Sequence, residues 1–387
     1  MQHENRCFAE IDLDVIDNNL KQLKKYNKKI MAIVKADAYG HGYQHICKSL
    51  ENVGLDFFGV SNINEAIELR TVGITTPILI LGYTDPKNAK LLSDYNITQA
   101  IFSKIYAKDL NTVATDNNII INAHFKIDTG MGRIGFTATK DIYNVIEDLC
   151  EISSFSNLNI DGIFTHFAVA DTNQEKDVQY TNTQHSLFDT TVKLLQQRNI
   201  NFKYIHCLNS AGILQYNQWQ YDMVRAGIIL YGCSPSNEVT CDTKPALQLK
   251  ASVSLVKNLN KGESVSYGCI FTSDKDMKVA TVSAGYADGY PRALSNIGIV
   301  SVKGKSVKVI GRVCMDQLII DVSNIDNVQQ GDIVTLYGTS PADTVTEVAT
   351  KSNTINYEIL CRITRRVPRV YTRNGEVVAV TEYLGNI

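Results

Sequence analysis

Residues 30–42 read IMAIVKADAYGHG, an apolar run that leads directly into a lysine and a glycine-containing turn. The run Ile30–Val34 is continuously apolar, which is typical of a parallel strand buried on both faces. Lys35 ends the run, and the small residues that follow leave room for a ligand. A lysine in this position is a candidate nucleophile, because burial would lower the pKa of its amine. The competing interpretation is a lysine that extends from the strand end into solvent.

Seven further apolar runs follow the first, and segments with helical spacing separate them. The eight predicted strands are Ile30–Val34, Phe57–Val60, Ile78–Leu81, Ala100–Phe102, Ala123–Ile127, Ile160–Phe167, Phe202–Leu208 and Met223–Leu230. Between two of them, Ile142, Val145 and Leu149 recur at intervals of three and four, which places them on one face of a helix. Strands that alternate with helices predict βαβ units, and eight strands are the number that closes a TIM-type (β/α)8 barrel.

After about residue 245 the pattern changes to β runs separated by turn residues. The runs are Leu247–Leu259, Lys278–Val282, Ile299–Val302, Val307–Val309, Leu318–Val322 and Ile333–Leu336, with a short helical stretch near Thr346–Ser352. The sequence therefore predicts an α/β protein with a barrel domain over residues 1–245 and a mainly antiparallel β domain over residues 246–387. It leaves open whether a strand over Phe8–Ile11 pairs with the second domain.

The composition is typical of a soluble globular protein and excludes several functional classes. Of the 387 residues, 44% are hydrophobic and 20% are charged. At roughly 100–200 residues per domain, this length predicts two domains. The formal net charge of −2 argues against a strongly basic nucleic-acid binder. The first residues contain no apolar leader segment, and no run approaches the length of a membrane span, so neither secretion nor membrane insertion is expected.

Nine cysteines are scattered along the chain, and none of them forms a C-x-x-C pair. An odd number in a long chain is typical of a reduced cytoplasmic protein rather than of a disulfide scaffold or a zinc site. We expect each cysteine to be small, buried filler, and we expect no bound metal.

Barrel enzymes carry their chemistry at the carboxyl ends of the strands, so these ends indicate the candidate site residues. The candidates are Lys35 after the first strand, Lys126 and Arg133 in and after the fifth, His166 in the sixth, Asn209 and Ser210 after the seventh, and Arg225 and Gly227 in the eighth. Ser210 and Gly227 lie where barrels commonly bind a phosphate. A lysine and a phosphate site in one pocket are what pyridoxal 5′-phosphate (PLP) requires.

Three other patterns have an ordinary structural interpretation. Residues 130–135 read GMGRIG and fit the dinucleotide pattern G-x-G-x-x-G, but they do not open a helix directly after a strand, so a dehydrogenase is disfavoured. Four arginines over residues 362–369 alternate with apolar residues and predict a solvated strand face rather than a nucleic-acid site. His41 and His206 are expected to be hydrogen-bonded histidines in loops or behind the site, rather than ligands.

The ordered motifs of the chain resemble those of the alanine racemase family. In the barrel they are VKADAYGHG at 34–42, KIDTGMGR at 126–133, THFA at 165–168, NSA at 209–211 and RAGI at 225–228. In the second domain they are VSYG at 265–268, GYADGY at 285–290, GRVCMDQ at 311–317 and INYE at 355–358. The resemblance implies a PLP-dependent racemase, a homodimer of barrel-plus-β-domain subunits that supplies D-alanine for peptidoglycan.

The resemblance also implies a two-base mechanism on an aldimine of PLP. Lys35 matches the Schiff-base lysine, which works on one face of the substrate, and Tyr267 from the partner subunit matches the base on the other face. Racemisation moves a proton from one face to the other, so two proton-exchanging groups suit it better than one. A tyrosine is a poor base unless positive charge favours its phenolate, and His166 and Arg225 are the implied sources of that charge.

Further matches imply binding roles. Arg225 matches the residue that faces the pyridine nitrogen, and since arginine has only donors, that nitrogen stays unprotonated, which disfavours side reactions. Other cofactor-binding matches are Tyr39, His166, Asn209, Ser210, Gly227, Ile228 and Tyr357. Arg133 and the backbone of Met315 match contacts to the substrate carboxylate. Lys126 matches a lysine that is often carbamylated in the family, where the product orients Arg133. The matches at the substrate entrance are Asp171, Tyr286, Arg292 and Arg312.

Three alternatives stay open at this point. Serine, or a broad range of amino acids, is the close alternative to alanine, although Tyr357 beside the substrate side chain argues for a small pocket. A PLP decarboxylase of the same layout expects a carboxylate opposite the pyridine nitrogen, where this sequence has Arg225. A PLP-carrier protein would resemble the first domain only, whereas this chain retains Tyr267 and Met315.

Overall fold

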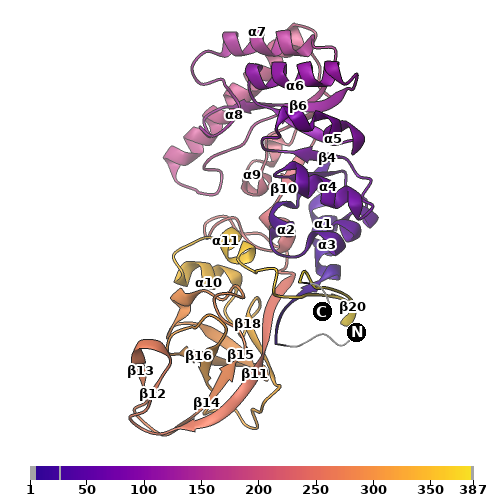
Figure 1. Ribbon diagram of the computed structural model, residues 1–387. Coiled ribbons are helices and arrows are strands. Elements are labelled where there is room, and N and C mark those ends of the chain that lie inside the picture. The colour runs from indigo at the N-terminus through magenta and orange to yellow at the C-terminus, as the bar shows by residue number, and fades with distance from the viewer. Residues whose placement is uncertain (1–5, 26–27, 385–387) are drawn as a thin grey trace.

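Eight parallel strands form the barrel of the first domain, in the upper part of Figure 1. The computed structural model describes residues 6–25 and 28–384; residues 1–5, on which the expected lack of a leader partly rests, lie outside this range. The strands are β2 (Ile30–Ile33), β3 (Phe57–Val60), β4 (Ile78–Ile80), β5 (Thr98–Ile101), β6 (Ile121–Asp128), β8 (Leu158–Phe164), β9 (Tyr204–His206) and β10 (Val224–Ala226). They pair in the order β10-β2-β3-β4-β5-β6-β8-β9. The Asp222 N–H donates to the Ile205 carbonyl (3.1 Å), and the Arg225 N–H donates to the Leu208 carbonyl (3.0 Å). These hydrogen bonds join the β9 and β10 ends of the sheet and close the barrel.

The eight predicted strands are confirmed, but two of them end three or more residues earlier than the sequence suggests. β10 ends at Ala226, whereas the predicted strand continued to Leu230. Gly227 has a ψ of −109°, outside the strand region, and the chain turns into the 3-10 helix η3 (Ile228–Tyr231). β8 ends at Phe164, so His166 lies in the loop beyond the strand. Both early endings put polar residues into loops at the carboxyl end of the barrel.

Amphipathic helices cover the outside of the barrel. They are α1 (Leu13–Lys24), α3 (Tyr43–Asn52), α4 (Ile63–Thr71), α5 (Ala89–Asp94), α6 (Lys104–Asp116), α7 (Ile142–Ser153), α8 (Glu175–Gln197) and α9 (Ser210–Gln215). In α1, the Asp12 carboxylate accepts two backbone N–H groups and caps the helix, while Ile16 and Leu20 are buried. Within the described residues, no helix is both long and apolar enough to cross a membrane.

The second domain is built on one nine-stranded sheet. Its strands are β1 (Cys7–Asp12), β11 (Leu247–Leu259), β14 (Met277–Val282), β15 (Ile299–Val302), β16 (Lys305–Ile310), β17 (Leu318–Asp321), β18 (Ile333–Tyr337), β19 (Arg369–Arg373) and β20 (Glu376–Thr381). They lie in the order β14-β17-β16-β15-β18-β11-β1-β19-β20. All these pairs are antiparallel except β1 with β19, which confirms the predicted mainly antiparallel domain. Two helices, α10 (Val345–Lys351) and α11 (Asn356–Cys361), follow β18.

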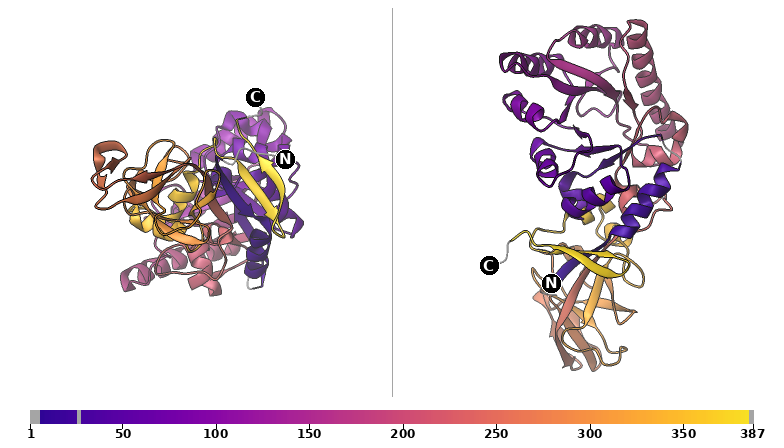
Figure 2. Two further views of the ribbon diagram at one scale, coloured as in Figure 1. Left: turned by 90° about the horizontal axis from the view of Figure 1, so that it is seen from below. Right: turned by 90° about the vertical axis from the view of Figure 1, so that its right-hand side faces the viewer.

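The first strand of the chain belongs to this second sheet. β1 pairs antiparallel with β11, where Cys7 lies opposite Ala251, and parallel with β19, where Ala9 lies opposite Arg369. Figure 2 shows the C-terminal hairpin of β19 and β20 beside the N-terminal strand, below the barrel. The sequence left open whether a strand over Phe8–Ile11 pairs with the second domain, and the structure shows that it does. The division into residues 1–245 and 246–387 stays a prediction.

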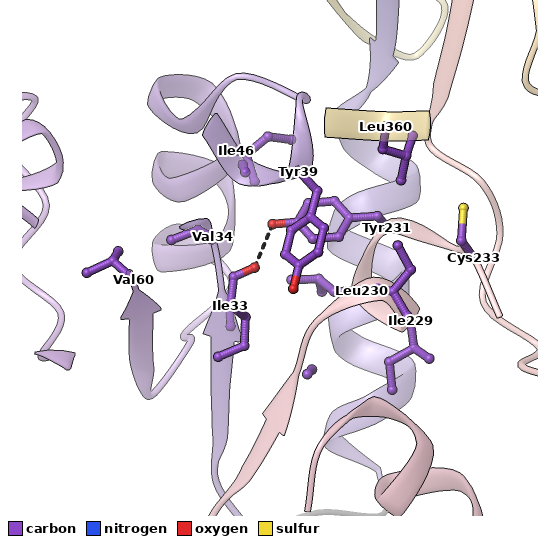
Figure 3. Close-up of a cluster of buried hydrophobic side chains, with 14 of the residues drawn as sticks. Ile33, Val34, Tyr39, Ile46, Val60, Ile229, Leu230, Tyr231, Cys233 and Leu360 are labelled. Carbon is purple, nitrogen blue, oxygen red and sulfur yellow. Dashed lines mark hydrogen bonds between the residues drawn. The ribbon is translucent and has the colours of Figure 1, made fainter. Parts of the chain in front are cut away.

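Buried side chains join the two domains at the carboxyl end of β2. The Tyr231 hydroxyl donates to the Ile33 carbonyl (2.9 Å), and the Tyr39 ring lies 5.0 Å from the Tyr231 ring (Figure 3). Leu360 of α11 packs into the same cluster from the second domain (Figure 3). This packing holds α11 against the segment that follows β2.

Two expectations about side-chain exposure are wrong. Cys269 and Cys361 are exposed, although Cys47 and Cys233 are buried as expected. Of the four arginines over residues 362–369, Arg369 alone lies in a strand, and only 1% of it is exposed. Its guanidinium binds backbone carbonyls in the interior, so the predicted solvated strand face does not form.

Candidate active site

A cavity of about 670 Å³ opens among the loops that follow the barrel strands. This volume is typical of a site for a small molecule. Most of the predicted site residues line it: Lys35, Tyr39, Lys126, Arg133, His166, Asp171, Asn209, Ser210, Arg225, Gly227 and Tyr357. Tyr357 lies on α11, so both domains of one chain shape the cavity.

Lys35 begins an unusual turn directly after β2. Residues 36–39 have φ angles of 52°, 56°, 52° and 52°, so they form a left-handed turn that contains no glycine. Each such residue costs roughly 1–2 kcal/mol, so contacts from outside must stabilise the turn. Lys35 itself is exposed, which contradicts the predicted burial of its amine. The buried part of the strand ends at Val34, and the cavity that Lys35 lines is open to solvent.

Hydroxyl groups from two loops converge beside Gly227. Ser210 Oγ accepts a hydrogen bond from the Gly227 N–H (2.9 Å), and Asn209 caps α9. A Cβ at position 227 would lie 3.2 Å from the Tyr39 hydroxyl and 3.3 Å from Ser210 Oγ, so glycine keeps this space open. Hydroxyl and backbone N–H groups without a carboxylate fit a phosphate. The Ile228 side chain is buried in the core, which leaves its backbone as the candidate contact.

The Arg225 guanidinium is almost fully buried in the cavity wall, with 2% of the residue exposed. Its Nη2 donates to the carbonyls of Thr165 (2.7 Å) and Cys207 (3.0 Å). Its Nη1 lies 3.0 Å from His206 Nδ1, so His206 is a hydrogen-bonded residue behind the site, as predicted. Burial lowers the pKa of Arg225 to about 10, which still leaves the guanidinium charged at neutral pH.

His166 lies beside Arg225, with its Nδ1 3.3 Å from the guanidinium Nη2. Burial, followed by the positive charge of Arg225, holds the pKa of His166 well below its usual range. Burial and Arg225 lower the pKa of His206 in the same way. Both histidines are therefore neutral at pH 7. His166 and Arg225 are the two groups predicted to supply positive charge to Tyr267, and of these only Arg225 is charged at pH 7.

Four cationic side chains line the cavity: Lys35, Lys126, Arg133 and Arg225. Burial lowers the pKa of Lys126 to about 8, with the charges of Arg133 and Arg225 adding to the effect. Arg133 lies in the loop between β6 and β7 (Phe136–Thr137), and residues 130–135 begin no helix, so the dinucleotide interpretation is excluded. This concentration of positive charge favours an anionic ligand.

Several lining residues were missed by sequence reasoning. Ser61 and Gly82 follow β3 and β4, and the strand-end rule would have found them if it had been applied to these two strands. The Phe164 ring lies 5.6 Å from Lys126 Nζ and 5.5 Å from the Arg225 guanidinium, so it packs against both cations. As one apolar residue in an apolar strand, Phe164 carries no signal in the sequence.

Tyr267 and Met315 do not line this cavity within one chain. They lie in the second domain beside a separate depression of about 490 Å³, together with Ser266 and Cys314. Their exposed fractions are 72% and 52%, which is high for large side chains with apolar surface. One chain therefore does not bring its own Tyr267 to its own Lys35.

The residues predicted at the substrate entrance divide in the same way. Asp171 lines the Lys35 cavity, whereas Tyr286, Arg292 and Arg312 lie in the second domain and do not line it. A Cβ on Gly268 would lie 3.3 Å from Arg312 Nε, so Arg312 lies against the turn that carries Tyr267.

Comparison with known proteins identifies the family of the chain. The family models of the alanine racemase N-terminal domain and C-terminal domain match residues 11–235 and 246–371. The chain belongs to the alanine racemase family. Alanine racemase 2 of Caldanaerobacter subterraneus subsp. tengcongensis is 41% identical to it over 383 residues, which are 97% of each chain.

Solved alanine racemases have the same architecture. That of Clostridium difficile 630 superposes with a TM-score of 0.93 at 36% identity, covering 99% of this chain and 100% of the other. That of Bacillus anthracis, solved with bound L-Ala-P, gives a TM-score of 0.90 at 35% identity and covers 99% of each chain. The chain is thus an amino-acid racemase with a TIM-type barrel followed by a mainly antiparallel β domain, as its sequence predicts.

Proposed function

We propose that this racemase interconverts L-alanine and D-alanine with PLP held by Lys35. The observation that supports the proposal is one cavity lined by a lysine, a glycine turn with hydroxyl groups, and a buried arginine. These groups fit PLP: a lysine for its aldehyde, hydroxyl and N–H donors for its phosphate, and a donor for its ring nitrogen. When bound, PLP withdraws electrons from the α-carbon of an amino acid and so makes the α-proton removable at neutral pH.

The residues of the cavity have separate tasks in this proposal. Lys35 holds the cofactor and exchanges a proton with the α-carbon on one face. Arg225 holds the ring nitrogen as a donor and leaves it unprotonated, since a guanidinium has no acceptor. His166 packs beside Arg225 as a neutral ring. The phosphate would be held by Tyr39, Ser210, Gly227, Ile228 and Tyr357, and Asn209 would be a further contact to the cofactor.

A second copy of the chain completes the site in this proposal. The partner subunit's Tyr267 exchanges a proton on the opposite face, and the partner subunit's Met315 joins Arg133 in binding the substrate carboxylate. The exposure of both residues supports this, because exposed apolar surface of this kind marks an interface. The charge of Arg225 would favour the phenolate of Tyr267. The entrance would combine Asp171 with the second-domain residues Tyr286, Arg292 and Arg312.

We further propose that Lys126 is carbamylated. Its amine lies among three other cations, and its pKa of about 8 leaves a useful fraction uncharged for attack on CO₂, with loss of one proton to water. The product is an anion that offsets the charge of Arg133 and can orient its guanidinium. We expect a carbamate signal after growth or exchange in ¹³C-bicarbonate, more intense at pH 9 than at pH 7. Lys126→Ala should lack the signal, and a signal of equal intensity in Lys126→Ala would contradict the assignment.

The experiment that tests the function is a racemase assay on the purified protein with its visible spectrum recorded in parallel. We expect D-alanine from L-alanine, absorbance of lysine-bound PLP, and a larger kcat/KM for alanine than for serine. A larger value for serine would replace alanine as the substrate, and CO₂ release from an amino acid would indicate the decarboxylase instead. Restored growth of a D-alanine-requiring bacterium would support the proposed supply of D-alanine for peptidoglycan.

A further inference from the structure

The left-handed turn after Lys35 is held by residues of the second domain that have no part in the proposed chemistry. The buried Arg369 donates from Nε to the Gly40 carbonyl (3.0 Å) and from Nη2 to the Ile363 carbonyl (2.9 Å). The Tyr371 hydroxyl donates to the His41 carbonyl (3.0 Å). Arg369 and Gly40 are 329 residues apart in the chain, so the contact is purely tertiary.

The carboxylate of Asp37, a residue inside the turn, makes further contacts with other elements. Its Oδ1 accepts the N–H of Tyr43 (3.0 Å), the first residue of α3. Its Oδ2 accepts the hydroxyl of Tyr383 (2.6 Å) and lies 3.6 Å from Arg369 Nη2. One carboxylate therefore connects the turn to the next helix and to two residues of the C-terminal segment.

Tyr383 is brought to this point by a segment beyond the family match. The match to the C-terminal domain ends at residue 371, and β20 then pairs with β19 and returns along it. This return places the Tyr383 ring 5.1 Å from the Arg369 guanidinium and 5.7 Å from that of Arg365. Tyr383 thus contacts both members of the Arg369–Asp37 pair.

We propose that Tyr383, Asp37 and Arg369 form a brace that keeps the left-handed turn in the conformation that presents Lys35 to the cavity. A turn of four non-glycine residues at positive φ keeps this conformation only while other contacts stabilise it. Neither Asp37 nor Tyr383 lines the Lys35 cavity, so both are positioning residues that act through the turn. The inference rests on the proposed function, in which Lys35 holds PLP.

The discriminating variant is Tyr383→Phe, which removes one hydroxyl and keeps the ring over Arg369. Its matched control is Tyr143→Phe, the same change at an exposed side chain on α7. The Gly40 N–H bonds to the Ala36 carbonyl (3.0 Å) and the Gly42 N–H to the Asp37 carbonyl (2.9 Å), so both amides report on the turn by hydrogen exchange.

We expect both amides to exchange about tenfold faster in Tyr383→Phe without cofactor, and PLP to leave the loaded enzyme about tenfold faster. The variant's kcat should fall while its KM for alanine stays nearly constant, because no substrate contact changes. Asp37→Asn should speed exchange at both amides at least as much, because it also removes the charge that faces Arg369. Tyr383→Phe should have a smaller effect in the Asp37→Asn background than in the wild type, because the two residues share one hydrogen bond.

If hydrogen exchange at the Gly40 and Gly42 amides is unchanged in Tyr383→Phe, the proposed brace is wrong. Unchanged PLP release despite faster exchange would also overturn it, because the turn would then move without affecting Lys35. Failure of the proposed function has a different signature, namely a wild-type protein that neither binds PLP nor racemises alanine. The exchange measurement without cofactor is independent of that outcome.

Discussion

Lys35→Ala is expected to lower kcat/KM for alanine by more than about 10⁴-fold and to remove the visible absorbance of lysine-bound PLP. The effect is large because one amine carries two tasks, attachment of the cofactor and proton exchange at the α-carbon. A second lysine, Lys126, lines the cavity, but only 6% of it is exposed, and its amine lies 3.4 Å from the Leu81 carbonyl. We therefore expect that Lys126 cannot hold PLP in place of Lys35.

The matched control for this prediction is Lys176→Ala, which removes an exposed lysine from α8. It should keep the wild-type spectrum and activity, and both variants should unfold at nearly the wild-type temperature, since neither side chain is buried. Intact visible absorbance in Lys35→Ala would show that another lysine holds the cofactor. Loss of that absorbance in Lys126→Ala would then identify Lys126 as the site.

Tyr267→Phe is expected to keep the visible absorbance of bound PLP and to lower racemase kcat by about 10²–10⁴-fold, the usual contribution of a general acid or base. This change removes only the hydroxyl, and the Tyr267 side chain is largely exposed within its own chain, so the fold should not change. Met315→Ala serves as a comparison, because loss of its side chain leaves the proposed backbone contact in place. Full activity in Tyr267→Phe would remove Tyr267 from the mechanism.

Mixed dimers test whether Tyr267 acts on the partner. If Lys35→Ala and Tyr267→Phe chains are unfolded, mixed and refolded, each mixed dimer contains one site with both residues intact and one with neither. Random assembly should then restore about a quarter of the wild-type activity from two inactive proteins. If Tyr267 acts within its own chain, no intact site forms and the mixture stays inactive.

The barrel and the gathering of the candidate site residues at one end of it were predictable, because their signals in the sequence are local. Continuous apolar runs indicated the eight strands, and the rule that chemistry lies at strand ends then brought Lys35, His166, Ser210 and Arg225 to one end without any knowledge of long-range contacts. The same rule indicated Lys126 as a candidate site residue, and the structure adds that burial lowers the pKa of its amine.

Features that depend on distant parts of the chain were not predictable in this way. Arg369 has the sequence pattern of a surface residue, but carbonyls from Gly40 and Ile363 satisfy its guanidinium in the interior. The pKa of His166 is lowered by its burial and by the charge of Arg225, which comes from a strand about 60 residues later in the chain. The positive φ angles of residues 36–39 could not be predicted, because none of these four residues is glycine and their conformation depends on contacts from the second domain.

The position of β1 has a consequence for the order of events during synthesis. β1 is synthesised before the barrel strands, yet its two neighbours, β11 and β19, begin only at residues 247 and 369. The barrel strands are all complete by residue 226, so they can assemble on a nascent chain while β1 still has no strand to pair with. β1 therefore has no first partner until the whole barrel has been made, and no second partner until β19 has been made. A bulky fusion at the N-terminus would therefore hinder the closing step of the second sheet rather than the formation of the barrel.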